Sequence, residues 1–438
     1  MKPKRPTVAL VSLGCPKNLV DSEKMLALLA EGGCVVGAPM DRADVVVVNT
    51  CGFLSAAREE SLGIIREAVE LKRARRGRRV VVAGCLVDRD ADKLFHLAPG
   101  IDAIVGVNSR DDILQAVMGD RASPGVRPYA GGVLSDAGRF RLTPRHTAYL
   151  RVAEGCSQRC AFCTIPAIRG PFRSKPVRAV LGEAVELIAD GAVELNVIAQ
   201  DTTAYGRDLT PPTTLARLLS HLACQGGAEW IRLLYAYPRR FTHELMEVMA
   251  RHETIVSYVD IPLQHISDGV LKRMGRAVTR AATEKMLTDL RRIVPGVVIR
   301  TTFIVGFPGE TEAEFRELLD FVKAFRFDAM GVFEFSPEEG TPAARMAGQV
   351  PAAVKARRSR RLMLAQQKIA FAANRRLVGR PVRVLVDGRD AQGRCVARSA
   401  AQAPDIDGVC VLTTDCEPGT FVSGTVVATE GYDVIVRP

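Results

Sequence analysis

Three cysteines stand close together in the segment EGCSQRCAFC. Cys156, Cys160 and Cys163 form a C-x3-C-x2-C pattern directly after an apolar, strand-like segment. Three thiolates on one loop can bind three irons of a [4Fe–4S] cluster, and the fourth iron then stays open to a small molecule. A structural zinc site would need a fourth Cys or His at similar spacing, and the nearest histidine, His146, lies before the strand. The pattern therefore predicts an iron–sulfur cluster with one open iron.

Three further cysteines are far apart in the sequence but occupy equivalent positions. Cys15 follows VALVSLG, Cys51 follows VVVVNT and Cys85 follows VVVAG, so each comes just after a Val-rich strand. In an open α/β sheet the carboxyl ends of the parallel strands share one edge, where ligands usually bind. A small buried core residue is the ordinary alternative for any one of them. Their shared position favours a second cluster with three protein ligands.

The total of eleven cysteines is odd, which makes a disulfide framework a poor explanation and favours metal binding in a reducing compartment. The remaining cysteines share no structural position and receive no role: Cys34, Cys224, Cys395, Cys410 and Cys416.

The elements that must position these residues begin with a βα series over residues 1–120. Continuous Val-rich runs separated by amphipathic segments predict a small doubly wound domain with a parallel sheet. Residues 121–146 are rich in Pro, Gly and Arg and are interpreted as a linker. Strands are expected over 8–13, 45–49, 80–83 and 101–105, and helices over 18–31, 55–72 and 91–97.

A second βα series covers residues 147–350 and predicts six units, which would make an open, partial (β/α)6 barrel. Residues 351–373 are expected to form a basic linker helix. Residues 374–438 contain short β-rich runs separated by Gly, Asp and Pro, which is typical of a small all-β barrel. The fold class is therefore α/β in the first two domains, followed by a β domain.

Polar side chains recur where the strands of the second series end. An adenosyl ligand needs hydrogen-bond donors and acceptors at that edge of the barrel. Each residue alone has an ordinary structural alternative, a turn or a hydrogen-bonded core side chain. The candidates are Gln200, Asp201, Gln264, His265, Gly306, Gly309 and Glu310.

The bulk composition sets limits on the partners. The chain has 438 residues, a formal charge of +11, and no apolar run near the ~18 residues that a membrane span requires. The basic start is followed by only a short apolar stretch, which predicts a first strand and not a signal peptide. We therefore expect a cytoplasmic protein without membrane contact. Much of the positive charge lies in residues 72–79 and 355–361, which have the pattern of solvated helix faces.

Taken together, these motifs resemble the radical S-adenosylmethionine (SAM) methylthiotransferases over essentially the whole chain. The resemblance implies two [4Fe–4S] clusters, an auxiliary one on Cys15, Cys51 and Cys85 and a radical SAM cluster on the triplet. It also implies a C-terminal TRAM-type domain and SAM as cofactor. It assigns Gln200 and Gln264 to the cofactor pocket and places Phe162 near the adenine.

Two branches of this family differ in substrate. Several segments resemble the branch that modifies an aspartate in a decoding-centre protein of the small ribosomal subunit (the RimO type): VSLGCPKNLVDSE, AQDTTAYG, YAYPRRFT, DIPLQHI and SPEEGTP. Glu338 and Glu339 follow the sixth strand, where carboxylates would repel phosphate and attract a basic protein loop; an acidic loop without a role is the alternative. Residues 374–438 carry no net charge, since eight Arg balance six Asp and two Glu, whereas an RNA-binding barrel would be expected to be basic.

The resemblance implies that an electron donor reduces the triplet cluster, that SAM is cleaved, and that the adenosyl radical removes hydrogen from the aspartate β-carbon. Sulfur at the auxiliary cluster, methylated by another SAM, would then bond to that carbon. The alternative substrate is isopentenyladenosine in tRNA (the MiaB type). A non-catalytic alternative is an iron–sulfur protein that binds RNA or senses redox state.

Overall fold

The structure is a computed structural model that describes residues 5–75, 77–119, 125–126 and 132–438. Its N-terminal sheet has five parallel strands in the order β2–β1–β3–β4–β5. This order is that of flavodoxin-like doubly wound sheets, so the predicted fold of this domain is confirmed. The strands are β1 (Thr7–Ser12), β2 (Val35–Val36), β3 (Val45–Thr50), β4 (Arg79–Gly84) and β5 (Ala103–Val105).

Helices cover both faces of this sheet, which explains why its strands are continuously apolar. Leu62, Ile65 and Leu94 belong to the core on one face, and Met25 and Ile113 belong to the core on the other. The helices are α1 (Pro16–Glu31), α2 (Ser55–Ala74), α3 (Cys85–Leu97) and α4 (Ile113–Met118).

Helix α3 corrects one prediction, because it begins at Cys85 and not at Ala91. Asp90 has a non-helical backbone (φ −131°) inside this helix, and its carboxylate accepts two hydrogen bonds from Arg58. The sequence pattern detected only the part of the helix after this kink. Cys85 is consequently the first residue of a helix that starts directly at the end of strand β4.

The central domain is a six-stranded parallel sheet in the order β13–β12–β11–β10–β9–β6. Its edge strands β6 and β13 do not pair with each other, so the barrel is open, as predicted. The strands are β6 (Thr147–Arg151), β9 (Glu194–Ile198), β10 (Trp230–Leu233), β11 (Ile255–Asp260), β12 (Val298–Val305) and β13 (Ala329–Glu334). A short hairpin of β7 (Ala153–Glu154) and β8 (Arg173–Ser174) follows the first strand.

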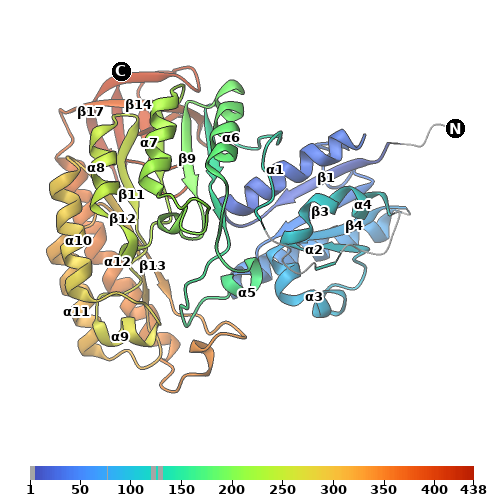
Figure 1. Cartoon of the computed structure of the whole chain (residues 1–438), viewed down its shortest axis with the longest axis horizontal. Coiled ribbons are helices and arrows are strands. Elements are labelled where there is room, and N and C mark those ends of the chain that lie inside the picture. Colours follow the sequence, from blue (N-terminus) through green and yellow to red (C-terminus); the bar gives the residue numbers. More distant parts are fainter. Residues whose placement is uncertain (1–4, 76, 120–124, 127–131) are drawn as a thin grey trace.

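The main apolar core lies between this sheet and its helices, and contains Leu195, Leu219 and Phe315. Figure 1 shows α8, α10 and α11 along one side of the sheet, with the N-terminal domain on the opposite side. The helices are α5 (Ile165–Arg169), α6 (Val177–Ala189), α7 (Leu215–Gln225), α8 (His243–Arg251), α9 (Asp268–Arg273), α10 (Arg280–Ile293), α11 (Glu312–Phe325) and α12 (Ala352–Arg375).

The C-terminal domain is a closed five-stranded barrel in the order β14–β15–β16–β18–β17. It confirms the predicted small β barrel. The strands are β14 (Pro381–Arg389), β15 (Cys395–Ser399), β16 (Cys410–Leu412), β17 (Phe421–Glu430) and β18 (Asp433–Arg437).

All three domains meet at one apolar cluster. Val20 of α1, Trp230 and Tyr258 of the central sheet, and Leu385 and Phe421 of the C-terminal barrel belong to it. The rings of Trp230 and Phe421 meet edge to face with centroids 4.9 Å apart. The C-terminal barrel therefore packs on the central sheet and is not a freely tethered appendage.

The described part of the segment interpreted as a linker, residues 132–146, is bound into the same assembly. Asp136 is buried, and its carboxylate pairs with Arg110 of the N-terminal domain and with Arg151 and Lys175 of the central domain. These cations hold the pKa of Asp136 well below its usual value, against the opposing effect of burial. No helix in the described residues is long and apolar enough to cross a membrane.

Candidate active site

The cysteine triplet lies on a loop that begins at a glycine no other residue could replace. Gly155 has φ +76°, and a Cβ there would lie 2.2 Å from the carbonyl oxygen of Pro171. The loop is then held by backbone hydrogen bonds from Cys156 to Gly170 and from Ala161 to Met274. The hairpin and the segment after α9 thus fix the loop from two sides.

The three thiols of this loop influence one another electrostatically. Burial raises the pKa of Cys156 to about 11 and that of Cys163 to about 12, and the neighbouring thiols add to both increases. Arg276 lies beside Cys160, with its Nη1 atom 3.9 Å from the sulfur. Metal binding requires thiolates, so these thiols would release protons when they bind iron.

Cys15, Cys51 and Cys85 come together at the carboxyl edge of the N-terminal sheet. A Cβ on Gly14 would lie 3.2 Å from the Cys51 sulfur, so the loop before Cys15 contacts Cys51 directly. A Cβ on Gly52 would lie 2.7 Å from the Cys85 carbonyl oxygen. The charge of Cys15 contributes to raising the pKa of both other thiols, after the larger effect of burial. The three separated cysteines are therefore neighbours in space.

Two buried cations face these thiols, and sequence reasoning missed both. Burial disfavours the Cys15 thiolate, but Lys17, Arg169 and backbone N–H groups outweigh it and lower the pKa of Cys15. Burial also lowers the pKa of Lys17 to about 8, and its ammonium lies 3.0 Å from the ring centroid of Tyr235. Only the position of Lys17 two residues after Cys15 could have drawn attention to it.

Arg169 connects the two groups of cysteines. It is the last residue of α5, six positions after Cys163, and its Nε and Nη2 atoms each lie 3.2 Å from the Cys85 sulfur. Its Nη1 atom donates to Glu154 at 3.1 Å, and Nη2 lies 3.0 Å from Asp21. One fully buried guanidinium of the central domain thus touches a thiol of the N-terminal domain.

Glu154 lies between Arg169 and Gln200, a residue of the predicted cofactor pocket, and binds both. It accepts a hydrogen bond from the Gln200 side-chain amide at 2.5 Å, and Arg169 and Arg151 lower its pKa to about 2 despite burial. The Gln200 side-chain oxygen is buried and has no hydrogen-bond partner. Because a buried acceptor without a partner is costly, this atom indicates a place for a donor from a bound molecule.

Gln264, Phe162 and His265, three further residues predicted at the site, make different kinds of contact. Gln264 adopts φ +72° and bonds through its backbone to Thr302 and Ile304. Phe162 is half-buried against an apolar cluster and meets Phe307 edge to face. His265 is buried, its Nδ1 accepts from Ser267, and burial lowers its pKa to about 3.

Two of the polar residues at strand ends have partners within the chain. Asp201 accepts hydrogen bonds from Gln158 and Arg240. Glu310 accepts from the backbone N–H groups of Gly306 and Phe307. These carboxylates shape the loops around the site.

Glu338 and Glu339 were predicted to overhang the barrel mouth, and the structure gives both of them partners in the N-terminal domain. Glu338 is buried, pairs with Arg89 at 2.9 Å and accepts from the backbone N–H of Ser55. Glu339 is exposed and pairs with Lys93 at 3.0 Å. The acidic loop therefore bridges two domains, an arrangement that strand order alone could not predict.

The residues present fit iron–sulfur clusters and a SAM molecule. In the described residues, no three Cys, His, Asp or Glu side chains are arranged around a single metal ion. A [4Fe–4S] cluster makes a different demand, because each thiolate binds its own iron and the sulfurs stand farther apart. Each group of three thiols has a buried arginine beside it, Arg169 for one and Arg276 for the other, and the Gln200 oxygen offers a hydrogen-bond acceptor. This set of donors is compatible with two such clusters.

Comparison with protein families matches three models along the chain. Residues 7–106 match Uncharacterized protein family UPF0004, residues 150–322 the Radical SAM superfamily, and residues 378–438 the TRAM domain. The chain is 45% identical to "Ribosomal protein uS12 methylthiotransferase RimO" of Desulforudis audaxviator, covering 98% of this chain and 96% of that protein. It is 46% identical to the protein of the same name from Moorella thermoacetica, covering 98% and 97%.

The chain belongs to the RimO family. The recognition made from the motifs is thereby confirmed, and so is the order of domains it implied. The central domain is a radical SAM domain, which works with an iron–sulfur cluster and SAM. The chain is accordingly an enzyme.

Solved structures support the fold alone. The radical SAM methyltransferase TsrM of Kitasatospora setae, solved with cobalamin and a [4Fe–4S] cluster, has a TM-score of 0.55 at 17% identity and covers 78% of this chain and 77% of its own. The cobalamin-dependent radical enzyme OxsB has a TM-score of 0.53 at 14% identity, covering 84% of this chain and 56% of its own. Both likenesses agree with a radical SAM barrel.

Proposed function

We propose that the chain transfers a methylthio group to the β-carbon of an aspartate in the decoding-centre protein uS12 of the small ribosomal subunit. The observation that carries this proposal is the pair of thiol trios joined by Arg169. Membership of a family whose curated members are named uS12 methylthiotransferases supports the substrate. The reaction would occur in the cytoplasm, on free uS12 or on the assembling or complete subunit, with an electron supplied by a donor protein.

The thiols of Cys156, Cys160 and Cys163 would hold the radical SAM cluster, and those of Cys15, Cys51 and Cys85 an auxiliary cluster. When bound, the first cluster supplies the electron that cleaves SAM, and the second supplies a site for the sulfur that joins the substrate carbon. Radical chemistry suits this reaction because an unactivated C–H bond offers no acid–base handle.

The chain's own residues orient the reactants and exclude water. The unpartnered side-chain oxygen of Gln200 would accept a hydrogen bond from SAM. Phe162 and the backbone of Gln264 would form the neighbouring wall of the pocket. Arg169 and Lys17 place two positive charges beside the auxiliary thiolates. Such charges stabilise thiolates in a buried site, where an uncompensated anion would be costly.

Intact mass of purified uS12 before and after reaction tests the proposal. A gain of one methylthio group on uS12, with none on tRNA incubated in parallel, is the expected result. Mass gain on tRNA and none on uS12 would reject the ribosomal substrate and favour the isopentenyladenosine alternative. A chain that binds iron but forms no 5′-deoxyadenosine after dithionite reduction would instead be a non-catalytic iron–sulfur protein.

Cys15→Ala tests the division of labour between the clusters. We expect this variant to form 5′-deoxyadenosine at close to the wild-type rate and to make no methylthio product, because only the auxiliary site loses a ligand. Its iron content should fall from ~8 to ~4 atoms per chain, since each cluster contributes four. Cys34→Ala, at a buried cysteine without an assigned role, is the matched control and should keep both activities.

A further inference from the structure

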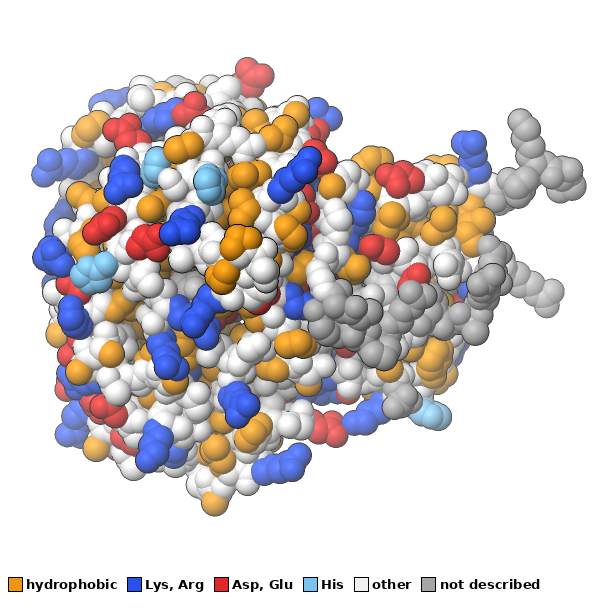
Figure 2. All heavy atoms as spheres, viewed as in Figure 1, with side chains coloured by type: hydrophobic (Ala, Val, Ile, Leu, Met, Phe, Trp, Pro, Cys, Tyr) orange, Lys and Arg blue, Asp and Glu red, His pale blue; other side chains and the backbone are white. Residues whose placement is uncertain are grey.

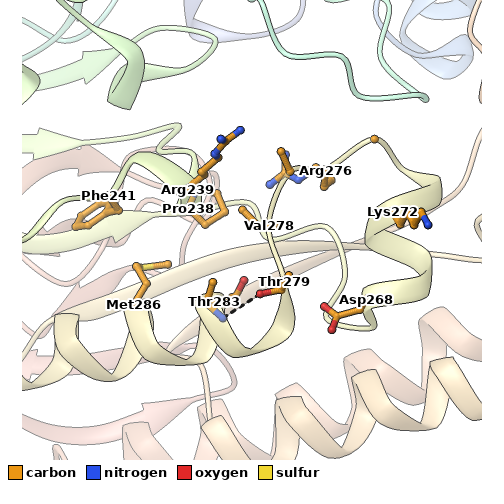
Figure 3. A pocket seen from close by; sticks show the side chains of 13 residues that line it. Pro238, Arg239, Phe241, Asp268, Lys272, Arg276, Val278, Thr279, Thr283 and Met286 are labelled. Atoms are coloured by element: carbon orange, nitrogen blue, oxygen red, sulfur yellow. Dashed lines mark hydrogen bonds between the residues drawn. The ribbon is translucent and has the colours of Figure 1, made fainter.

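An open pocket of about 830 Å³ lies in the central domain, and none of its lining residues belongs to either group of cysteines. Its walls come from the segment after strand β10, from α9 and the loop that follows it, and from the start of α10. Figure 3 shows Arg239 and Arg276 on one side of it and Lys272 on α9 on the other. Arg276 contacts Cys160, Pro262 and Tyr237, and these residues, like all the lining residues, belong to the central domain.

Two of the lining residues, Gly275 and Arg276, also contact the loop that carries the cysteine triplet. Arg276 lines the pocket and also lies 3.9 Å from the Cys160 sulfur. Gly275, another lining residue, approaches the loop so closely that a Cβ there would lie 2.5 Å from the Arg159 carbonyl oxygen. A molecule seated in the pocket would therefore be separated from the radical SAM cluster site by little more than one arginine.

The rim of the pocket is positively charged. Arg239 and Lys272 line the pocket and are exposed, and the exposed Arg159 belongs to the cysteine loop that Gly275 contacts. Within the described residues none of these three cations makes an ion pair. Asp268 is the one acidic residue among the lining residues, and it accepts a hydrogen bond from the backbone of Arg280. Figure 2 shows Lys and Arg side chains across the lower part of the central domain, the region where Figure 1 places α9.

We infer that this basic pocket is the docking surface for an acidic one-electron donor protein of the reduced iron–sulfur (ferredoxin) class. The inference rests on the proposed function, because only a working radical SAM cluster needs that electron. On docking, the donor loses one electron and the triplet cluster gains it, with no bond made or broken. Complementary charge speeds such encounters, and electron-transfer contacts are small and weak, which suits a rim of three cations.

The surface fits a protein better than RNA. Single-stranded RNA is usually bound on exposed aromatic side chains that stack with its bases. The pocket has one aromatic lining residue, Phe241, and this residue is buried. The neighbouring Tyr237 is also buried, under the guanidinium of Arg276. Cations without a stacking surface favour an acidic protein as the occupant.

The test uses the full chain carrying both clusters and, as the donor, a reduced two-cluster bacterial ferredoxin. The rate of cluster reduction is followed by stopped-flow absorbance at low ionic strength, and ferredoxin affinity is measured by titration. We expect the double variant Arg239→Glu and Lys272→Glu to be reduced by ferredoxin about 10-fold more slowly or worse. Reduction by dithionite, and the 5′-deoxyadenosine it yields, should stay at the wild-type level.

Arg357→Glu with Arg360→Glu, two exposed positions on α12, makes the same change in net charge away from the pocket and should keep the wild-type rate. Added salt should slow the wild type towards the pocket variant. The inference is overturned if ferredoxin reduces the wild type and the pocket variant at equal rates, or if the α12 control is slowed as much as the pocket variant. It is also overturned if dithionite reduces the wild-type cluster and ferredoxin does not. Tight tRNA binding that the pocket variant alone loses would also overturn it, in favour of RNA. Absence of methylthio product with intact ferredoxin reduction would reject the proposed function and leave the docking surface standing.

Discussion

At the scale of single residues, buried cations lie beside the cysteine thiols that we propose as cluster ligands. The guanidinium of Arg169 contacts both the Cys85 sulfur and the Glu154 carboxylate. The same carboxylate accepts a hydrogen bond from Gln200, so one arginine connects an N-terminal thiol with the predicted cofactor pocket. Residues that support metal ligands commonly contribute 10–100-fold in metal affinity. We therefore treat Arg169 as a positioning residue for the auxiliary cluster.

Replacing Arg169 by Gln should weaken the auxiliary cluster selectively. The Cys85 thiolate would lose its buried counter-charge, and we expect the affinity for the auxiliary cluster to fall about 10–100-fold. The measurement is iron content together with the electron paramagnetic resonance signal of each cluster. Arg178→Gln, at an exposed arginine of α6, is the control. Unchanged auxiliary iron and an unchanged signal in Arg169→Gln would contradict the assigned role.

Gln200→Leu tests the cofactor pocket. It removes the unpartnered acceptor while keeping a side chain of similar size, and we expect the KM for SAM to rise about 10-fold, since a lost hydrogen bond in a buried site costs about 1–3 kcal/mol. Iron content should not change. Gln225→Leu, at an exposed residue at the end of α7, should leave KM unaltered. A wild-type KM in Gln200→Leu would remove Gln200 from the pocket.

The positions of the thiols could be predicted from the sequence, but those of the cations could not. Val-rich runs before Cys15, Cys51 and Cys85 place these residues at strand ends, and parallel strands bring their carboxyl ends to one edge. Their ligand role stays a prediction. Arg169 meets them only because α5 of another domain docks on the first, and no pattern local to AFCTIPAIRG encodes that contact.

At the scale of elements, the C-terminal barrel docks through buried ion pairs as well as apolar contacts. Arg398 of β15 donates to Glu194 of β9 at 2.7 Å and to Asp387 of β14. Asp387 in turn lies 3.0 Å from His146. Glu194 is fully buried and also pairs with Arg232 of β10. The domain interface is therefore sensitive to the loss of any one member.

Arg398→Met should destabilise the protein by up to about 3–5 kcal/mol, the cost of breaking a buried ion pair, because Glu194 would keep only Arg232 as its counter-charge. Thermal unfolding at pH 7 measures this. Arg394→Met, which breaks two pairs at the surface of the same barrel, with Asp390 and with Glu430, is the matched control and should unfold close to the wild-type temperature, because surface pairs contribute little. Equal effects of the two substitutions would contradict a special role for the buried pair.

The same pair predicts a pH dependence. Burial opposes ionisation of Glu194, but Arg232 and Arg398 lower its folded-state pKa from 4.5 to about 2. A lowered folded pKa gives stability that is present above pH 4.5 and is lost as the pH falls towards 2. Without Arg398 the pKa of Glu194 should rise, so the gap in stability between wild type and Arg398→Met should narrow below pH 4.5. A constant gap down to pH 3 would contradict the assignment.

The patterns of the sequence located the long elements well and missed the short ones. The Val-rich strands and amphipathic helices of both α/β domains carry a strong periodic signal. Strand β2 has only two residues, and the β7–β8 hairpin pairs two residues with two, which is too short for alternation to show. The β7–β8 hairpin nonetheless flanks the loop that carries the cysteine triplet.

At the scale of the whole molecule, two groups of buried ion pairs join the N-terminal domain to the barrel, in addition to Arg169 and the apolar cluster at Val20. One is the cluster of charges around Asp136 and Arg151, and the other is the pair of Glu338 with Arg89. The sequence predicted three domains in the right order, and the linker at residues 121–146 and the substrate contact at Glu338 stay predictions. The pairing of Asp136 and Glu338 with residues of the N-terminal domain could not be predicted. Contacts between domains depend on docking geometry, which composition and periodicity do not encode.

Glu338→Gln tests whether the acidic loop fastens the two domains or meets the substrate. The neutral amide would leave Arg89, which is 7% exposed, without its counter-charge, so we expect a loss of about 3–5 kcal/mol and faster proteolysis between the first two domains. Methylthio transfer should fall more than 5′-deoxyadenosine formation, because the former needs both thiol trios aligned. Glu339→Gln changes only an exposed pair with Lys93 and should unfold as the wild type does. If both variants instead had a higher KM for uS12 and wild-type stability, the loop would contact the substrate. Loss of the Glu338–Arg89 pair could not explain that result, because Glu339→Gln leaves this pair intact.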